Sequence, residues 1–250
     1  MSRKPERIFG RIPVLESLRA GKRSPRRLFF YANAKGLEAI RAAAGNLPVE
    51  AVTRDELDRL SQGQLHQGVV LETTALPRHR LEDWLNTPAC AKDAIVVLLD
   101  SIEDPHNFGA VIRSASALGV SGVIFAKDRS APLSPAATKA AAGAMEYIDL
   151  IQVTNLARSI RSLQDNGFWV ASLEADATQD LWQANFTGRI ALVIGSEGKG
   201  TRRLVRERCD FSLRIPLTGP ITSLNASVSA AIALTECARQ RSGNAPPAKG

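Results

Sequence analysis

The sequence of 250 residues has little of what marks several whole classes of protein. Aromatic residues make up only 5% of it, which argues against a stacking platform for single-stranded nucleic acid. Its three cysteines stand far apart without any CxxC spacing, so we expect reduced thiols and exclude a disulfide framework or a zinc site. The three histidines also lack metal-ligand spacing, and we expect no bound metal.

Long apolar runs are missing as well. No stretch approaches the ~18 apolar residues that a membrane span needs. The opening MSRKPERIFG is charged and has no apolar signal-peptide core, so we expect a cytoplasmic protein. With 44% hydrophobic and 23% charged residues, the composition is that of an ordinary globular chain, and the length favours two domains.

Positive charge is concentrated at one end of the sequence. The first thirty residues hold nine basic side chains against two acidic ones, an excess of +7 that equals the net charge of the whole chain. A localised basic face is typical of proteins that bind a polyanion. We therefore expect a nucleic acid partner, with a tail that only aids solubility as the alternative. The candidate RNA-binding residues are Arg11, Arg23, Arg26 and Arg27.

Two regions of the chain differ in their hydrophobic pattern. Residues 1–75 mix short helical and extended patterns, which predicts a small α/β domain. Residues 76–93 contain prolines and charges with little periodicity and are predicted to be a linker. From 94 to 241, near-continuous apolar strands such as AIVVLL and IALVI alternate with helices, which predicts a parallel sheet covered on both faces. Residues 242–250 are expected to be disordered.

Polar residues follow three of the predicted strands. Ligands of parallel α/β sheets bind at the carboxyl ends of the strands, so these loops are the candidate site. The first loop and its helix carry Asn107 and Arg113, the second carries Gly195, Glu197 and Gly198, and the third leads to Ser223 and Asn225. No Ser–His–Asp set or paired carboxylates accompany them, so group transfer from a bound donor fits better than hydrolysis.

Each of these features has a plainer alternative. Arg113 suits a phosphate or a carboxylate, but a surface salt bridge with Glu103 or Asp104 would place it equally well. The loop GSEGKGTRRL has the glycines of a phosphate-binding loop but Thr201 where that loop needs lysine. The helix that begins at SLNASVSAAIAL is either a tightly packed core helix with an ordinary cap or a helix start left open for a ligand.

Three segments of this region resemble a known family. NFGAVIRSASALG, ALVIGSEGKGTRRL and IPLTGPITSLNASVSAAIAL resemble, in order and spacing, the three motifs of the SpoU (TrmH-like) RNA ribose 2′-O-methyltransferases. Residues 8–73 resemble the small ribosomal-protein-like (L30e-like) RNA-binding domain of many members. The combination is most similar to the bacterial enzymes that methylate a guanosine in the peptidyl-transferase region of 23S rRNA. The departures are Ala226, where valine is usual, and the added proline of TGPIT.

The resemblance implies a fold, a cofactor and a set of roles. The fold is an α/β domain with a deep trefoil knot over residues 94–241, which binds S-adenosylmethionine and packs as a homodimer through the knot. The implied cofactor-binding residues are Gly195, Gly198, Ile215, Pro216, Ser223, Leu224 and Asn225. The implied catalytic residues are Arg113, Asn107, Glu197, Ser223 and Asn225.

Two questions stay open at this point. The motifs are those of donor binding, so tRNA is an alternative substrate to 23S rRNA, and a non-catalytic ribosome-assembly factor is an alternative to an enzyme. The family assigns the central role to the arginine at position 113. Because a guanidinium is always charged in proteins, we expect Arg113 to fix the target phosphate and ribose and to favour the developing alkoxide, and not to act as the general base.

Overall fold

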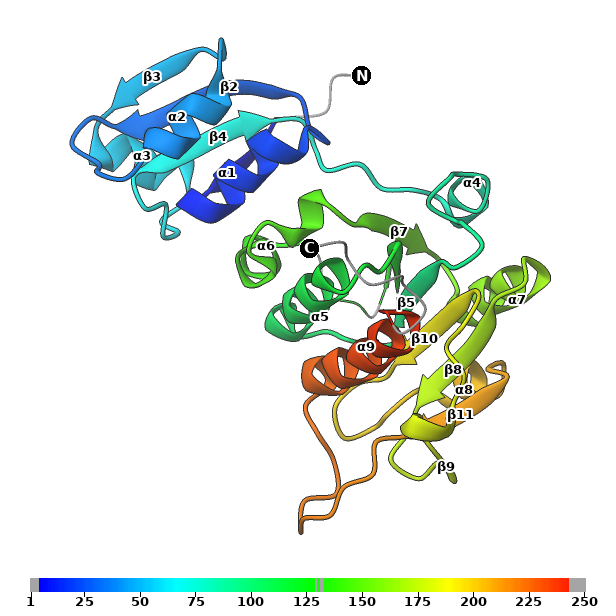
Figure 1. The fold of residues 1–250 in the computed structure, drawn as a ribbon. Helices are drawn as coiled ribbons and strands as arrows, with labels where there is room; N and C mark the ends of the chain where they lie inside the picture. The colour runs from blue at the N-terminus through cyan, green and yellow to red at the C-terminus, as the bar shows by residue number, and fades with distance from the viewer. Residues whose placement is uncertain (1–4, 129, 131–132, 243–250) are drawn as a thin grey trace, which may run out of the picture. The chain divides into compact units, whose positions relative to one another are not determined.

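The chain forms two compact units. A computed structural model describes residues 5–128, 130 and 133–242, so the tail expected to be disordered lies almost wholly outside the described residues. The first unit consists of residues 1–77 with 141–147, and the second of residues 78–140 with 148–250. Figure 1 shows both units and labels most of their helices and strands. Each unit has its own sheet.

The first unit is a four-stranded sheet of order β1-β4-β2-β3 with helices packed on it. Strand β4 runs antiparallel to β1 and β2, while β3 runs parallel to β2. Apolar side chains of α1 and α2 form one core with the sheet, and Leu57 of α3 forms a second, smaller one. The elements are β1 (Glu6–Phe9), α1 (Arg11–Ala20), β2 (Pro25–Tyr31), α2 (Glu38–Ala44), β3 (Val49–Val52), α3 (Arg54–Leu60), β4 (Val69–Thr73) and the 3-10 helix η1 (Ala144–Glu146).

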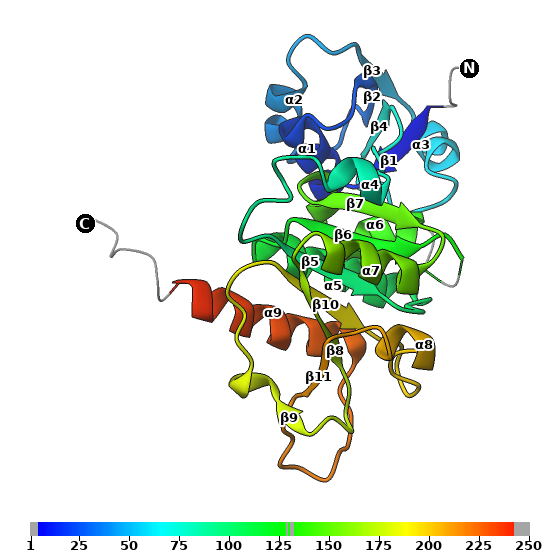
Figure 2. The same ribbon diagram turned by 90° about the vertical axis from the view of Figure 1, so that its right-hand side faces the viewer.

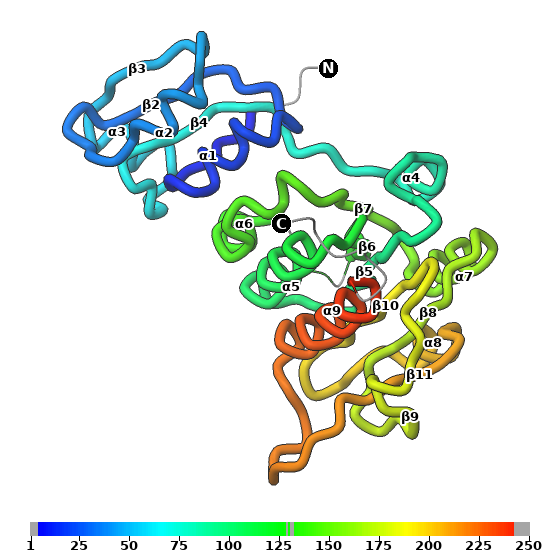
Figure 3. Tube along the Cα trace, in the orientation of Figure 1, coloured from blue at the N-terminus to red at the C-terminus, as the bar shows by residue number. Residues whose placement is uncertain are grey.

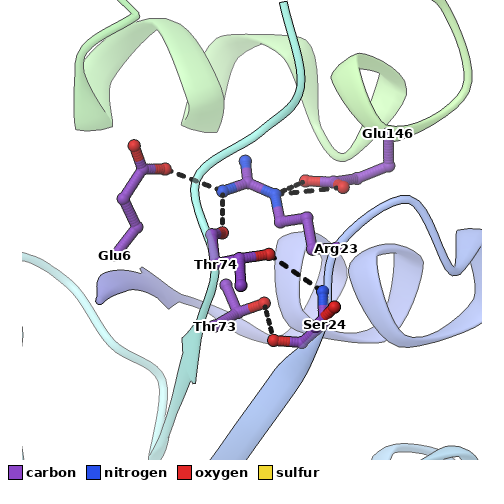
Figure 4. A network of polar contacts seen from close by, with 6 residues as sticks. All are labelled: Glu6, Arg23, Ser24, Thr73, Thr74 and Glu146. Atoms are coloured by element: carbon purple, nitrogen blue, oxygen red, sulfur yellow. Dashed lines mark hydrogen bonds and ion pairs between the residues drawn. The ribbon is translucent and has the colours of Figure 1, made fainter. Parts of the chain in front are cut away.

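A short excursion from the middle of the chain completes the first unit. Residues 141–147 belong to it, and Glu146 is buried against Arg23 (Figure 4). Arg23 Nε donates to Glu146 Oε1 at 2.9 Å, and Arg23 Nη1 donates to Glu6 Oε2 at 2.8 Å. The structure therefore corrects the expectation that Arg23 lies on an RNA-binding face. Its side chain is only 5% exposed, and its charge is neutralised inside the unit.

Residues 76–93 were predicted to be a linker, but part of this segment belongs to the core of the second unit. It contains the helical turn α4 (Leu81–Trp84), whose Leu81 and Trp84 are both buried. The Trp84 indole donates from Nε1 to Asp149 Oδ2 at 3.1 Å. Two apolar residues three positions apart are too few to produce a visible helical period, which is why the sequence pattern did not reveal the turn.

The second unit is built on a seven-stranded sheet of order β7-β6-β5-β10-β8-β11-β9, and its paired strands run parallel. Strands β5, β6 and β10 are buried along their whole length, so the predicted parallel sheet covered on both faces is confirmed. The elements are β5 (Ile95–Leu99), α5 (Pro105–Ala117), β6 (Gly122–Ala126), α6 (Pro135–Ala141), β7 (Asp149–Val153), α7 (Leu156–Asp165), β8 (Trp169–Leu173), β9 (Gln179–Asp180), the 3-10 helix η2 (Leu181–Gln183), β10 (Ile190–Ile194), α8 (Arg203–Arg206), β11 (Phe211–Arg214) and α9 (Ala226–Ser242).

Helices lie on both faces of this sheet. Figures 1 and 2 show α5 and α9 side by side on one face and α7 and α8 on the other. Helix α9 buries Ala226, Ala230 and Ala233, small side chains that let it pack closely on α5. One face of the alanine-rich helix is thus tightly packed in the core, while Val228 on the same helix is exposed. Among the described residues, no helix combines the length and the apolar character that crossing a bilayer requires.

The order of the strands places the candidate loops. Strand β6 follows β5 on one side, whereas β10 pairs with β5 on the other, so the chain direction across the sheet reverses between β5 and β10. Open parallel sheets bind ligands at such a reversal, outside the carboxyl ends of the strands. The loop after β10 lies there, and Figure 3 follows the long loop that leads from β11 to α9.

Candidate active site

Asn107 is fixed at the start of α5. Asp104 caps this helix, because its carboxylate accepts from the backbone N–H of His106 at 3.1 Å and of Asn107 at 3.2 Å, and Pro105 occupies the first turn. The cap places the half-buried Asn107 on the first helical turn. From there Asn107 Nδ2 donates to Glu197 Oε1 at 3.0 Å.

The loop after β10 is closed on itself and anchored. Ser196 and Gly200 exchange two backbone hydrogen bonds, of 3.1 and 2.9 Å. A Cβ at position 195 would lie 2.2 Å from the carbonyl carbon of Gly200, so this close approach requires glycine. The loop then leads to Arg202, whose Nε donates to Asp100 Oδ1 at 2.6 Å. Because the Asp100 carboxylate is fully buried, this ion pair fixes the loop to the end of β5.

Asn225 has two functions at the start of α9. Its Oδ1 accepts from the backbone N–H of Ser227 at 2.9 Å and of Val228 at 3.3 Å, which caps the helix. The cap orients the amide so that Nδ2 donates to Asn107 Oδ1 at 2.9 Å and also to Glu197 Oε1. Asn107, Glu197 and Asn225, which we call the amide–carboxylate cluster, therefore join three loops that are far apart in sequence. These loops meet as the strand-end rule predicts.

Arg113 lies further along α5 and is exposed. It forms no hydrogen bond or ion pair with any other residue that the structure describes, so the alternative of a salt bridge with Glu103 or Asp104 is not what the structure shows. Asp104 is occupied instead with capping its own helix. The guanidinium of Arg113 is thus available to a phosphate or a carboxylate from outside the described residues.

A pocket of about 520 Å³ opens beside the amide–carboxylate cluster, between the loops that follow β8, β10 and β11. Six of the seven residues predicted to bind a cofactor line it, namely Gly195, Gly198, Ile215, Pro216, Ser223 and Leu224. Asn225 does not line it, although its neighbours Leu224 and Ala226 do. Glu197 belongs both to the pocket wall and to the cluster.

Glu174 is a pocket residue that sequence reasoning missed. It follows β8 directly and contributes a buried carboxylate to the pocket wall. The rule that loops at the carboxyl ends of strands carry function applies to the strand FWVASL as well, and Glu174 is the first residue after it.

The structure also limits the chemistry of the second unit. Burial raises the pKa of the Cys209 thiol to about 12 and that of Cys237 to about 12, so neither is a thiolate near neutral pH. No cluster of potential metal ligands occurs within residues 5–128, 130 and 133–242. What the second unit does present is a pocket for a small molecule beside a set of hydrogen-bonding groups.

The remaining basic candidates of the first unit differ in their surroundings. Arg26 is exposed and has no partner among the residues described. Arg27 pairs with Glu50 at 3.2 Å between two half-exposed side chains, and Arg11 Nε donates to the Gln67 carbonyl at 3.4 Å. Counted over the whole unit, thirteen basic side chains face nine acidic ones, an excess of +4. Acidic residues of the same unit therefore offset much of the charge at the N-terminal end.

Comparison with known proteins identifies the family to which the chain belongs. Residues 94–235 match the SpoU rRNA Methylase family, and residues 7–79 match a domain described as RNA 2′-O ribose methyltransferase substrate binding. The chain is 44% identical over 194 residues to the 23S rRNA (guanosine-2′-O-)-methyltransferase RlmB of Escherichia coli (strain K12), an alignment that covers 78% of this chain and 80% of that protein. It is 42% identical over 206 residues to RlmB of Pseudomonas putida, covering 80% and 81% of the two chains.

A solved structure supports the same family assignment. The SpoU methyltransferase AviRb from Streptomyces viridochromogenes, in complex with its cofactor AdoMet, is similar with a TM-score of 0.81 at 25% identity, and the match covers 97% of this chain and 92% of that one. The family match spans the parallel sheet together with all three loops that meet at the amide–carboxylate cluster. The chain is a member of the SpoU rRNA methylase family.

Proposed function

We propose that this protein transfers a methyl group from S-adenosylmethionine to the ribose 2′-hydroxyl of a guanosine in 23S rRNA. The observation that carries the proposal is the meeting of three strand-end loops, which form the amide–carboxylate cluster beside the 520 Å³ pocket. Relatives at 42–44% identity are named for this reaction. The peptidyl-transferase region is the expected location of the guanosine, by the resemblance of the two-domain combination.

The pocket suits the proposed cofactor. Its volume lies within the range of roughly 300–1,000 Å³ that small-molecule sites occupy. Gly195 and Gly200 bring backbone groups close together at its wall, and Ile215, Leu217 and Leu224 add apolar surface. When bound, S-adenosylmethionine supplies a methyl group on a positively charged sulfur, which makes that methyl a ready electrophile.

The residues beside the pocket have separate roles in this proposal. Asn107 and Asn225 both donate to Glu197, so the cluster holds the three loops in one arrangement and orients the acceptor ribose. Arg113 is exposed and unpaired among the described residues, and we assign to it the phosphate of the target nucleotide and the negative charge that develops on its 2′-oxygen. Holding reacting groups in line contributes up to ~7–11 kcal/mol in well-oriented intramolecular reactions.

Ser223 completes the set of proposed site residues, since it lines the pocket next to Leu224. In the first unit, Arg11, Arg26 and Arg27 remain the proposed contacts to rRNA, and Arg23 is withdrawn because it is buried and paired. The unit matches a domain described as substrate binding, which supports this assignment. The domain boundaries that we propose for function are residues 1–75 for RNA binding and 94–241 for transfer.

Four finer features belong to the proposal. We infer an L30e-like fold for the first unit and a trefoil knot around the loops at 195–200 and 215–225, whose close backbone approach at Gly195 a knot would demand. We also infer a homodimer packed through the knot region, for which the exposed Ile221 and Val228 offer apolar surface. The site of action is inferred to be the cytoplasm, where rRNA is assembled into ribosomes.

The test is to map 2′-O-methylation in rRNA and tRNA from a strain that lacks the gene and from the same strain complemented with wild-type protein or with Arg113→Ala. The proposal expects one guanosine of 23S rRNA to lose its methyl group and to regain it only with the wild-type protein. A missing methyl group in tRNA would select the alternative substrate. Unchanged methylation in both RNAs would favour a non-catalytic assembly factor.

A further inference from the structure

Glu174 carries a buried carboxylate oxygen without a partner. The residue is only 8% exposed and lines the pocket, and its Oε1 has no hydrogen-bond partner among the residues that the structure describes. A buried acceptor that is left unpaired destabilises the folded protein, so such groups are rare unless a ligand satisfies them.

The surroundings hold this carboxylate in place. The Glu174 backbone N–H donates to the Leu213 carbonyl at 2.9 Å, which fixes the residue between the ends of β8 and β11. On its other side lies Gly200, where an added Cβ would lie 2.8 Å from Glu174 Oε2. Gly200 has φ +63°, so both its conformation and the nearby carboxylate favour glycine. The glycine-rich loop thus leaves space for the Glu174 side chain at the pocket wall.

The position of Glu174 in the sheet separates it from the reacting groups. Helix α5, which carries Asn107 and Arg113, follows β5, and Glu174 follows β8. Strand β10 lies between β5 and β8, so the two strand ends are two spacings apart, roughly 10 Å. With the methyl group at the amide–carboxylate cluster, as the proposed function requires, Glu174 would face a part of the donor that is remote from it.

We propose that Glu174 is a positioning residue that accepts hydrogen bonds from the ribose hydroxyls of the donor's adenosine. This inference rests on the proposed function, because it takes S-adenosylmethionine as the ligand. A ribose diol offers two adjacent O–H donors, which match the two oxygens of an ionised carboxylate. The amino-acid end of the donor carries two charges, which are costly to desolvate and suit the exposed wall at Thr222 and Ser223 better than this buried site.

The experiment uses calorimetry on the full-length protein with three ligands: S-adenosylhomocysteine, 5′-methylthioadenosine, which lacks the amino-acid end, and 2′,3′-dideoxy-5′-methylthioadenosine. Glu174→Gln keeps the size of the side chain and removes its charge. It should weaken binding of the first two ligands on the order of 10- to 100-fold, the range for a hydrogen bond to a charged group. The dideoxy ligand should bind wild type and Glu174→Gln equally weakly, because the interacting pair is already broken.

A second measurement separates a binding role from a structural one. Without ligand, the melting temperature of Glu174→Gln should equal or exceed that of wild type, since the variant removes a buried charge whose Oε1 has no hydrogen-bond partner. The matched control is Asp176→Asn, two residues further along the same loop, where an exposed carboxylate pairs with Arg206 at 3.0 Å and does not line the pocket. This variant should leave the affinity for every ligand unchanged.

The outcomes are distinguishable. If Glu174→Gln weakens the binding of S-adenosylhomocysteine but not that of 5′-methylthioadenosine, the carboxylate binds the ammonium group and the assignment to the ribose hydroxyls is wrong. If the variant binds all ligands as wild type does and melts at a lower temperature, Glu174 is structural and the inference is overturned while the proposed function stands. If the wild-type protein binds none of the ligands, the proposed function and this inference both fail.

Discussion

Replacing Arg23 by methionine should destabilise the first unit more than any exposed charge replacement would. The side chains of Arg23 and Glu146 are 5% and 2% exposed, and methionine retains the volume of the arginine stem but not its charge. Glu146 would then be buried without its cation (Figure 4). Removal of one member of a buried ion pair costs about 3–5 kcal/mol, because the charge that remains is uncompensated.

The stability lost in Arg23→Met should depend on pH, and the direction of this dependence follows from the pKa of Glu146. Burial raises the pKa of this carboxyl above its usual value of 4.5, and Arg23 opposes that rise. In Arg23→Met the opposing effect disappears, so the pKa in the folded state rises further. A carboxyl with a raised pKa binds its proton more tightly when folded, so its stabilising contribution is complete below the unfolded pKa and is lost as the pH rises through the folded pKa. The difference in free energy of unfolding between wild type and Arg23→Met should therefore be largest near neutral pH. It should decrease toward pH 4.5, by at most about 1.4 kcal/mol per pH unit.

Urea unfolding at several pH values measures this effect. All three tryptophans, Trp84, Trp169 and Trp182, lie in the second unit. The unfolding transition that tryptophan fluorescence reports should therefore occur at the same urea concentration as in wild type. Circular dichroism should show an additional transition at lower urea concentration, from the first unit. Arg27→Met, on strand β2 just after Arg23, is the control, because the exposed Arg27–Glu50 pair contributes at most about 1 kcal/mol. Replacing both Arg23 and Glu146 by methionine should recover most of the loss. Equal stability losses for Arg23→Met and Arg27→Met at neutral pH would refute this reasoning.

Three further predictions concern the second unit. Arg113→Ala and Arg113→Lys should both abolish methyl transfer in a tritium assay while calorimetry shows unchanged cofactor affinity, since Arg113 is exposed and a single ammonium cannot replace its planar fork. Asn225→Ala should cost about 1 kcal/mol in urea unfolding by removing the cap of α9, whereas Asn225→Ser should keep the cap and lose transfer only. Arg202→Met should leave the buried Asp100 unpaired at a cost of about 3 kcal/mol, and should weaken S-adenosylhomocysteine binding because the glycine loop loses its anchor.

Local patterns were sufficient to predict the sheet of the second unit and the meeting of the three candidate loops. Strands such as IALVI are apolar along their whole length because both of their faces are covered, and that burial is visible in one sequence. Parallel strands end at one edge, so the meeting of Asn107, Glu197 and Asn225 follows once the strands are identified. The cap that Asn225 provides is likewise a short-range feature, which the opening of the helix already suggested.

Long-range pairing was not predictable from these patterns. The burial of Arg23 depends on Glu146, 123 positions away along the chain, and no local signal links the two. The same holds for the excursion of residues 141–147 into the first unit, which has no period or turn motif of its own. A count of charges along the sequence treats every arginine as a surface group, and so it overstated the basic face.

That correction also changes which residues best test rRNA binding, because Arg11 and Arg27, although proposed contacts, already have partners within the first unit. Arg26, Lys35 and Arg54 are exposed and have no partner in the described part of the first unit, whereas Arg23 is buried and Arg27 is paired. If the first unit binds rRNA phosphates, each of the three exposed cations that contacts one should contribute roughly 0.7–0.9 to the slope of log affinity against log salt. Deleting residues 1–75 is a poor test, because residues 141–147 would lose the unit into which they pack.

Point variants avoid that difficulty. Replacing Arg26, Lys35 and Arg54 together by glutamine should make the salt dependence of binding to an rRNA fragment shallower by up to about 2–3, with S-adenosylhomocysteine affinity unchanged. Lys92→Gln serves as the control, because it removes one exposed, unpaired cation from the described part of the second unit. The triple variant lies in the unit that matches a substrate-binding domain, so it should change the slope more per charge than the control does. If the salt slope changed equally per removed charge in the triple variant and in Lys92→Gln, rRNA binding would depend on net charge alone. The first unit would then have no special role in binding.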